Sequence, residues 1–133
     1  YLGDVHQRLL FYKRISNTDT QEKLDNIRME LIDRFGIPPQ AVKQLFTVHQ
    51  VRLKAEQLGI TKVDVNTNGG YIEFSPDTPV QAISIIQLMQ KNPTHYRMEG
   101  GQRLKLTVHL SEYEERIQFI VTLLNKLLSE LNG

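Results

Sequence analysis

The sequence contains no cysteine among its 133 residues. Disulfide bonds, thiolate nucleophiles and cysteine-based zinc sites are therefore excluded. A chain without cysteine suits a reducing compartment, so we expect a cytoplasmic protein. Polar residues interrupt its apolar stretches, such as Phe119 to Leu124, far short of the ~20 residues that a bilayer-spanning helix needs. We therefore expect no membrane span.

An excess of one charge is also lacking. The 16 Lys and Arg residues against 15 Asp and Glu residues leave a net charge of +1. No overall field then draws the chain onto phosphates or anionic lipid, and a charged partner must be recognised by a local patch. The length is that of one domain, so residues 1–133 are predicted to form a single domain. Because the chain begins at Tyr1 without an initiator Met, we expect it to be part of a longer polypeptide.

The motifs of phosphate-binding loops, dinucleotide-binding turns, zincins and hydrolase elbows are absent. The four histidines are widely spaced: His6, His49, His95 and His109. His49 falls on the apolar stripe of a predicted helix and is better explained as a core histidine than as a metal ligand. The carboxylates at Glu112, Glu114 and Glu115 suit the first turn of a helix, where the helix dipole favours them. We therefore predict no catalytic, cofactor-binding or metal-binding residue, and no enzyme activity in this chain.

Start and stop signals predict three helices in the first half of the chain. The first spans 4–15, begins at Asp4 and carries an apolar stripe of Leu2, Val5, Leu9 and Tyr12. The second spans about 20–35, with Asp19 and Glu22 as a capping arrangement and Gly36 as its end. The third begins at Pro39 and ends at Leu58.

The second half alternates predicted strands and helices. The segments 60–65 and 71–74 are rich in β-branched and aromatic residues and form a hairpin around a turn at 66–70. A helix over 80–90 follows, with Thr78 as its N-cap. A second hairpin pairs 95–98 with 103–109, and Ser111 with Glu114 caps a long last helix. The fold class is therefore α+β: three helices, two hairpins forming a small antiparallel sheet with a helix between them, and a long C-terminal helix.

The apolar arc of the last helix covers about 200°, twice what an amphipathic surface helix needs. Its stripe contains Tyr113, Ile117, Ile120, Val121, Leu124, Leu128 and Leu131, flanked by Phe119, Leu123 and Leu127. The helix is therefore either central in the core or has a flank that contacts a partner.

The second helix has an acidic outer face. Opposite its apolar stripe lie Glu22, Asn26, Glu30 and Asp33, and this arc contains no cation. Glu30 and Asp33 repel each other slightly at i, i+3 spacing, and a basic partner would turn that cost into attraction. The face is either simply solvated or an interaction patch.

Nucleic-acid binding is a further alternative. Basic residues occur on the first helix and on the second hairpin: Arg8, Lys13, Arg14, Arg97, Arg103 and Lys105. These could contact phosphates, and Tyr71, Phe74 and Tyr96 lie on strands as in base-stacking platforms. Alternating aromatic residues on strands are more often core residues, so this signal is weak.

Several ordered blocks resemble the C-terminal domain of bacterial transcription-repair coupling factors. The blocks are Tyr1 to Ile15, Glu30 to Gly36, Leu58 to Ile60, Gly69 to Phe74, His95 to Met98 and Arg103 to Lys105. They cover the chain from end to end, and only the stretches 16–22 and 61–68 match poorly.

The resemblance implies a regulatory module of an ATP-driven DNA translocase that displaces RNA polymerase stalled at lesions and recruits the excision-repair protein UvrA. In that family this domain packs on the N-terminal UvrB-like module, covers the surface that UvrA uses and restrains the motor. It implies that Glu30 and Asp33 dock on basic side chains of that module. Glu22 and Asn26, on the same face of the helix, are predicted to belong to the docking surface as well. The resemblance also implies that ATP is bound by the motor of the parent protein and that this chain itself needs no cofactor.

Overall fold

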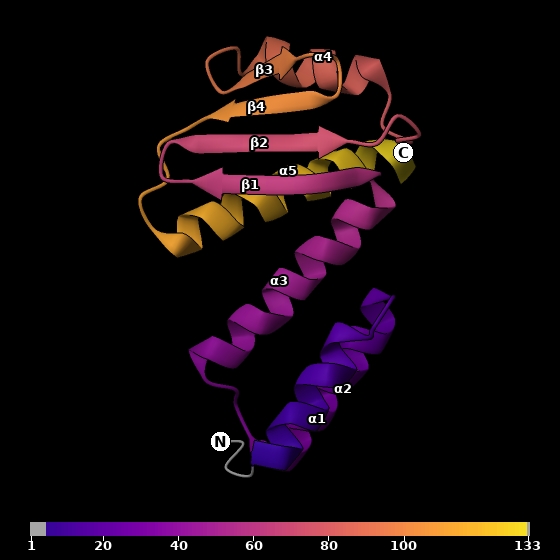
Figure 1. Cartoon of the computed structure of the whole chain (residues 1–133), viewed down its shortest axis with the longest axis vertical. Coiled ribbons are helices and arrows are strands. Elements are labelled where there is room, and N and C mark those ends of the chain that lie inside the picture. Colours follow the sequence, from indigo (N-terminus) through magenta and orange to yellow (C-terminus); the bar gives the residue numbers. More distant parts are fainter. Residues whose placement is uncertain (1–4, 133) are drawn as a thin grey trace. The chain divides into compact units, whose positions relative to one another are not determined.

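A computed structural model describes residues 5–132, without the side chain of Asn132. Within them the chain has five helices and four strands, in the order α1, α2, α3, β1, β2, α4, β3, β4, α5 (Figure 1). It divides into two compact units, Tyr1–Leu53 and Lys54–Gly133. The α+β prediction is confirmed, whereas the assignment of residues 1–133 to a single domain stays a prediction.

The first unit holds the three expected helices: α1 (Val5–Ser16), α2 (Gln21–Phe35) and most of α3 (Gln40–Gln57). Its core cluster consists of Phe11, Ile15, Leu24, Ile27, Leu31, Val42, Phe46 and Leu53. Helix α2 begins one residue after Thr20, whose side chain accepts a hydrogen bond from the backbone N–H of Lys23. The predicted cap at Asp19 is therefore wrong, because this carboxylate pairs with the Lys23 ammonium group at 2.8 Å.

The buried face of α1 differs from the predicted stripe. Val5 and Leu9 are exposed by 56% and 59%, whereas Phe11 and Ile15 are buried. The face of α1 that packs in the core is the one that carries Phe11. The ring of Phe11 makes an edge-on contact with the ring of Phe35, with the ring centroids 5.9 Å apart. The other predicted positions of the helix start, Asp4 and Leu2, lie outside the described residues.

His49 on α3 is buried in this core, as its position on the apolar stripe predicts. Its Nε2 atom lies 3.1 Å from the carbonyl oxygen of Thr18 and 3.0 Å from the guanidinium group of Arg52. These contacts join α3 to the loop between α1 and α2. His49 is therefore a packed, hydrogen-bonded core histidine.

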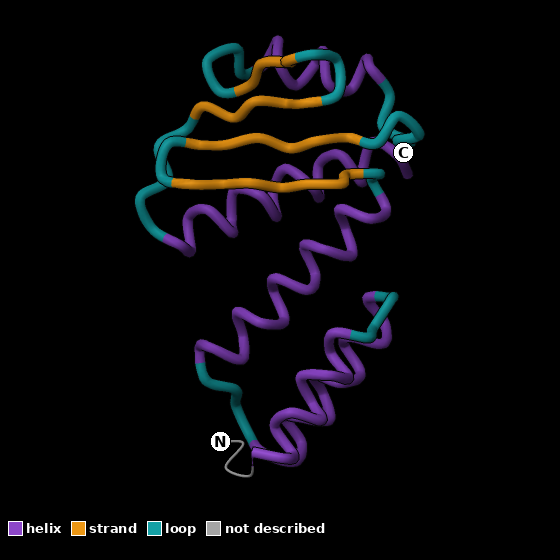
Figure 2. Tube along the Cα trace, in the orientation of Figure 1, coloured by secondary structure: helices purple, strands orange, loops and turns teal. Residues whose placement is uncertain are grey.

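The second unit contains an antiparallel sheet in the order β1-β2-β4-β3 (Figures 1 and 2). The strands are β1 (Ile60–Asn66), β2 (Gly69–Phe74), β3 (Tyr96–Glu99) and β4 (Arg103–Thr107), and the helices are α4 (Ala82–Lys91) and α5 (Tyr113–Asn132). The two hairpins therefore join through β2 and β4. Figure 1 shows α5 running behind the sheet, and its residues Ile120, Leu124 and Leu127 are buried. Of the two alternatives for this helix, the central core helix accounts for most of its apolar arc.

Three local predictions in this unit are wrong. Gly69 and Gly70 belong to β2 rather than to the turn, because they are paired with Asn66 and Val65 of β1 and with Thr107 and Leu106 of β4. Thr78 does not cap α4, because the helix begins only at Ala82; the Thr78 hydroxyl group donates to the carbonyl of Leu58 and accepts from the backbone N–H of Val80. Helix α5 begins at Tyr113, and Glu112 accepts its first backbone hydrogen bond, so Ser111 lies one residue before the cap position; its hydroxyl group donates to the side chain of Glu115, at 3.4 Å.

Candidate docking surface on the second helix

The outer side of α2 carries the predicted acidic face. Glu22, Asn26 and Asp33 are exposed, and they lie on the side of the helix opposite the buried Leu24, Ile27 and Leu31. Among the described residues, neither Glu22 nor Asp33 has an ion-pair partner. Two carboxylates on this face are therefore available to an external cation.

Glu30 is different, because it is already paired within the first unit. One carboxylate oxygen lies 2.6 Å from the guanidinium group of Arg14 on α1, and the other lies 3.9 Å from Arg34 one turn further along α2. The hydrogen bond from Arg14 is the main cause that lowers the pKa of Glu30, and the charges of Arg14 and Arg34 lower it further. The arc of α2 itself contains no cation, as the helical wheel predicts, but Arg14 from α1 neutralises Glu30.

The two arginines that contact Glu30 also cover aromatic rings. The guanidinium carbons of Arg14 and Arg34 lie 5.1 Å and 5.6 Å from the ring centroid of Phe11, and that of Arg34 lies 5.2 Å from the ring of Phe35. Such cation–π contacts favour one orientation of the arginine side chains. Glu30 therefore lies at the edge of the acidic face, in the seam between α1 and α2, with 37% of its side chain exposed.

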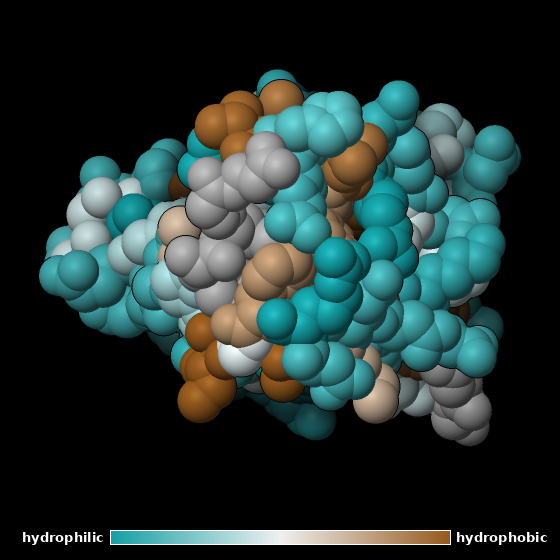
Figure 3. Space-filling view, turned by 90° about the horizontal axis from the view of Figure 1, so that it is seen from below, coloured by the Kyte–Doolittle hydropathy of each residue, from teal (hydrophilic) through white to brown (hydrophobic). Residues whose placement is uncertain are grey.

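Sequence reasoning missed one residue of this surface. Met29 lies between the acidic positions on the outer side of α2 and is exposed by 63%. Figure 3 shows that hydrophobic side chains, in brown, occur at the surface of the molecule among hydrophilic ones. Met29 lies three residues after Asn26 and four residues before Asp33. This spacing is the sequence signal that could have placed Met29 on the same face.

Three of the six basic residues of the nucleic-acid alternative are paired with carboxylates. On the sheet, Arg103 pairs with Glu73, with Nε and Oε1 3.1 Å apart, and Lys105 lies 3.8 Å from Glu99. Arg14 is held by Glu30, as described above. Lys13 and Arg97 are exposed, so only part of the predicted basic set faces solvent without a carboxylate partner among the described residues.

The strand aromatics do not form a stacking platform. Phe74 and Tyr96 are buried, and the guanidinium group of Arg103 lies 4.1 Å from the ring centroid of Tyr71. A face already occupied by a guanidinium group is not open to a nucleic-acid base.

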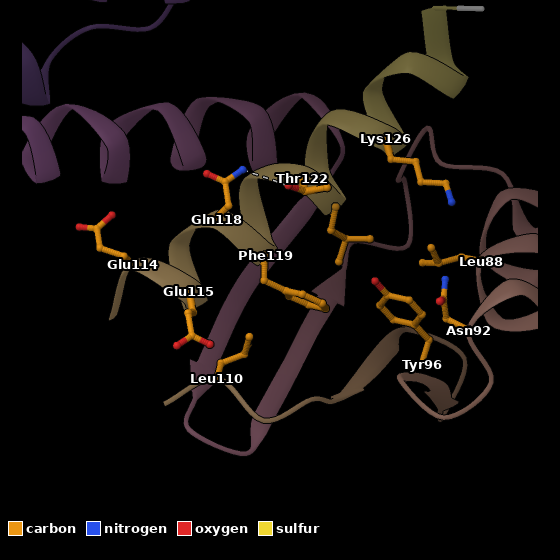
Figure 4. A pocket seen from close by; sticks show the side chains of 11 residues that line it. Leu88, Asn92, Tyr96, Leu110, Glu114, Glu115, Gln118, Phe119, Thr122 and Lys126 are labelled. Atoms are coloured by element: carbon orange, nitrogen blue, oxygen red, sulfur yellow. Dashed lines mark hydrogen bonds between the residues drawn. The ribbon is translucent and has the colours of Figure 1, made fainter. Parts of the chain in front are cut away.

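The second unit has an open groove of about 650 Å³ between α4, β3 and α5 (Figure 4). Phe119 and Tyr96 point toward its centre, with their rings stacked at a centroid distance of 6.2 Å. Burial raises the pKa of the Tyr96 hydroxyl group, so it stays protonated. The lining of the groove also includes the charged side chains of Glu114, Glu115 and Lys126.

Residues 5–132 contain neither a cluster of metal-ligating side chains nor a helix that could span a membrane. No group of three or more His, Asp or Glu side chains in this range is placed to hold a metal ion. None of the helices in the same range is both long and apolar enough to cross a bilayer.

The chain matches the family model described as the TRCF domain over residues 1–85. It is 43% identical over 127 residues to a transcription-repair-coupling factor of Haemophilus influenzae and 41% identical to that of Escherichia coli. Each match covers 96% of this chain but only 11% of the relative, so the chain spans about a tenth of these relatives.

The fold also matches a solved structure, described as the crystal structure of the C-terminal domain of transcription-repair coupling factor. The TM-score is 0.79 and the sequence identity 21%, and the match covers 97% of this chain and 83% of the other. A likeness at this identity concerns the fold alone.

Proposed function

Because the chain belongs to the TRCF domain family of bacterial transcription-repair-coupling factors, we propose that it is the regulatory, C-terminal domain of such a protein. In this proposal it docks through the outer face of α2 on the UvrB-like module of the same polypeptide. Docking covers the surface that UvrA would bind and restrains the DNA translocase. The domain performs no chemistry itself.

The observation that carries the proposal is the pair of exposed carboxylates on one helix face. Glu22 and Asp33 are exposed, and no described cation neutralises either of them. Asn26, between them, is exposed and can both donate and accept hydrogen bonds. A basic surface on the partner would complement this face in charge and in hydrogen bonding.

In this proposal Glu30 contributes to docking from the edge of the acidic face. Its carboxylate already accepts from Arg14, so a basic partner side chain would share the carboxylate with Arg14 or replace it. We therefore propose that Glu22 and Asp33 supply most of the charge attraction, and that Glu30 contributes less than its sequence position implied.

A weak interface is sufficient for this function. Two parts of one polypeptide have a high effective concentration, so a modest ion-paired contact stays closed most of the time. The same weakness allows a ligand that prefers the open state to shift the equilibrium. We propose that engagement of RNA polymerase by the parent protein supplies this bias.

The other parts of the proposal concern the parent protein. It would hydrolyse ATP in a motor outside this chain, displace RNA polymerase stalled at DNA lesions and recruit excision repair through UvrA. Its location would be the bacterial cytoplasm, and no cofactor is assigned to this chain.

Titration of the chain against the UvrB-like module tests the proposal. Changing Asp33→Lys or Glu22→Lys should weaken binding about 5- to 10-fold each, because one attraction is lost and one repulsion is added. Affinity should also fall as salt increases. Asp77→Lys is the matched control, because Asp77 is an exposed carboxylate of the second unit, and it should leave binding unchanged. Equal weakening by all three variants would contradict the proposal.

The alternative is a DNA-contacting accessory module that uses basic residues of α1 and of the β3–β4 hairpin. Its support is the exposure of Lys13 and Arg97. The pairing of Arg14, Arg103 and Lys105 with carboxylates argues against it, because paired cations release fewer counterions on binding to DNA.

A further inference from the structure

Met29 is an apolar side chain that contributes nothing to the core of its own unit. It is 63% exposed, whereas Ile27 and Leu31, two positions to either side, are buried. Two residues along a helix correspond to about 200° of rotation, so Met29 points away from the face that packs on α1 and α3. Ile32, three residues further along, is also 40% exposed.

The surroundings of Met29 are polar and acidic. Its neighbours one turn earlier are Asp25 and Asn26, and those one turn later are Ile32 and Asp33. Asp25, Asn26 and Asp33 are all exposed. Arg28, one turn before Ile32, is exposed as well. The outer face of α2 therefore has an apolar centre of Met29 and Ile32 within a polar rim that is acidic except at Arg28.

We propose that Met29, with Ile32 beside it, is the apolar anchor of the docking surface on α2, and that the partner surface has an apolar pocket framed by basic side chains. This inference rests on the proposed function and names what gives the interface its affinity. Specific interfaces commonly have an apolar centre inside a polar rim, and methionine is enriched in them. Its flexible thioether side chain also adapts to the shape of a pocket.

The expected effects on the binding constant indicate that Met29 contributes more to the affinity than the carboxylates do. Exposed ion pairs change a binding constant by at most about fivefold each. Transfer of a methionine side chain from water into an apolar pocket changes it by about 10- to 100-fold. The carboxylates would then set the orientation and the encounter rate, and Met29 would determine most of the dissociation rate.

The test compares three variants in titrations against the UvrB-like module at several salt concentrations. Met29→Gln keeps the length and the helix propensity of the side chain but makes it polar. Met29→Leu keeps the apolar character. Val48→Thr makes a similar change on α3, where Val48 is 48% exposed, and serves as the control.

We expect Met29→Gln to weaken binding about tenfold or more. The dependence of its affinity on salt should equal that of the wild type, because no charge has changed. Met29→Leu and Val48→Thr should bind like the wild type. Circular dichroism and thermal unfolding should show all three variants folded, since the changed side chains are exposed.

The outcomes separate the inference from the proposed function. If the wild type binds with the expected salt dependence and Met29→Gln binds equally well, the apolar anchor is overturned and the acidic docking stands. An altered salt dependence in Met29→Gln would also overturn the anchor, because its effect would then be electrostatic. If the wild type does not bind, both proposals fail.

Discussion

The guanidinium group of Arg14 lies 2.6 Å from the carboxylate of Glu30 and joins α1 to α2. Arg14 at the same time covers the ring of Phe11. A residue that the sequence places on a free acidic face is thus held inside the first unit by a neighbouring helix. Any substitution of Glu30 therefore changes the α1–α2 contact as well as docking, and the two effects must be separated.

A double-mutant cycle measures the first effect. Arg14→Gln, Glu30→Gln and the double variant should give a coupling free energy of about 0.2–1 kcal/mol, the range of exposed pairs, because both side chains are more than one-third exposed. Urea unfolding followed by circular dichroism provides the measurement. The same cycle with Asp33→Asn in place of Glu30→Gln should give no coupling. A coupling to Asp33 as large as that to Glu30 would contradict the geometry.

Ionisation of Glu30 should make the free energy of unfolding depend on pH in acid. Its pKa in the folded state lies below the ordinary value of 4.5, chiefly because Arg14 donates a hydrogen bond to its carboxylate. A lowered folded-state pKa means that the stabilisation is fully present above 4.5 and is lost as the pH falls through the lower folded-state value. The difference in unfolding free energy between wild type and Glu30→Gln should therefore be constant near neutral pH and shrink below 4.5. A difference that grows in acid would rule out this account of the pair.

Gly70 and Gly100 should differ in their tolerance of a side chain. A Cβ at Gly70 would lie 1.8 Å from the backbone oxygen of Asp64, so Gly70→Ala should separate β1 from β2 and cost more than about 3 kcal/mol. At Gly100 no atom lies within 4 Å of the added Cβ, and only the positive φ of 66° opposes alanine. Gly100→Ala should therefore cost about 1 kcal/mol. Thermal unfolding of the two variants checks the order, and equal losses would contradict the close β1–β2 approach.

DNA binding by the isolated chain should be negligible. Fluorescence anisotropy with a labelled duplex at low salt should give no saturable signal, because carboxylates balance Arg14, Arg103 and Lys105. If the duplex does bind, with a steep salt dependence that Arg97→Gln reduces, the nucleic-acid alternative replaces the docking proposal.

The order of helices and strands could be predicted from the sequence because periodicity and caps are local. The end of α2 at Gly36 and the core position of His49 follow from patterns within one helix. Some of the wrong predictions concern the choice between two local contacts, as at Asp19, which pairs with Lys23 four residues on. Others involve groups that are brought together by tertiary structure. The hydroxyl group of Thr78 donates to the carbonyl of Leu58, 20 residues away, and α4 begins only at Ala82.

The same limit applies to the candidate site. The helical wheel correctly places Glu22, Asn26 and Asp33 outside, because that arrangement depends on α2 alone. It could not show that Arg14 neutralises Glu30, since this requires α1 to fold back along α2. Met29 was missed because methionine on a helix is more often a core residue, and only its exposure shows otherwise.

Binding of UvrA to the full-length parent protein is the most direct test of the central claim, that the outer face of α2 masks the UvrA-binding surface. The account predicts that Glu22→Lys combined with Asp33→Lys raises UvrA affinity, while Asp77→Lys leaves it at the wild-type value. Unchanged UvrA affinity in the folded double variant would contradict the claim.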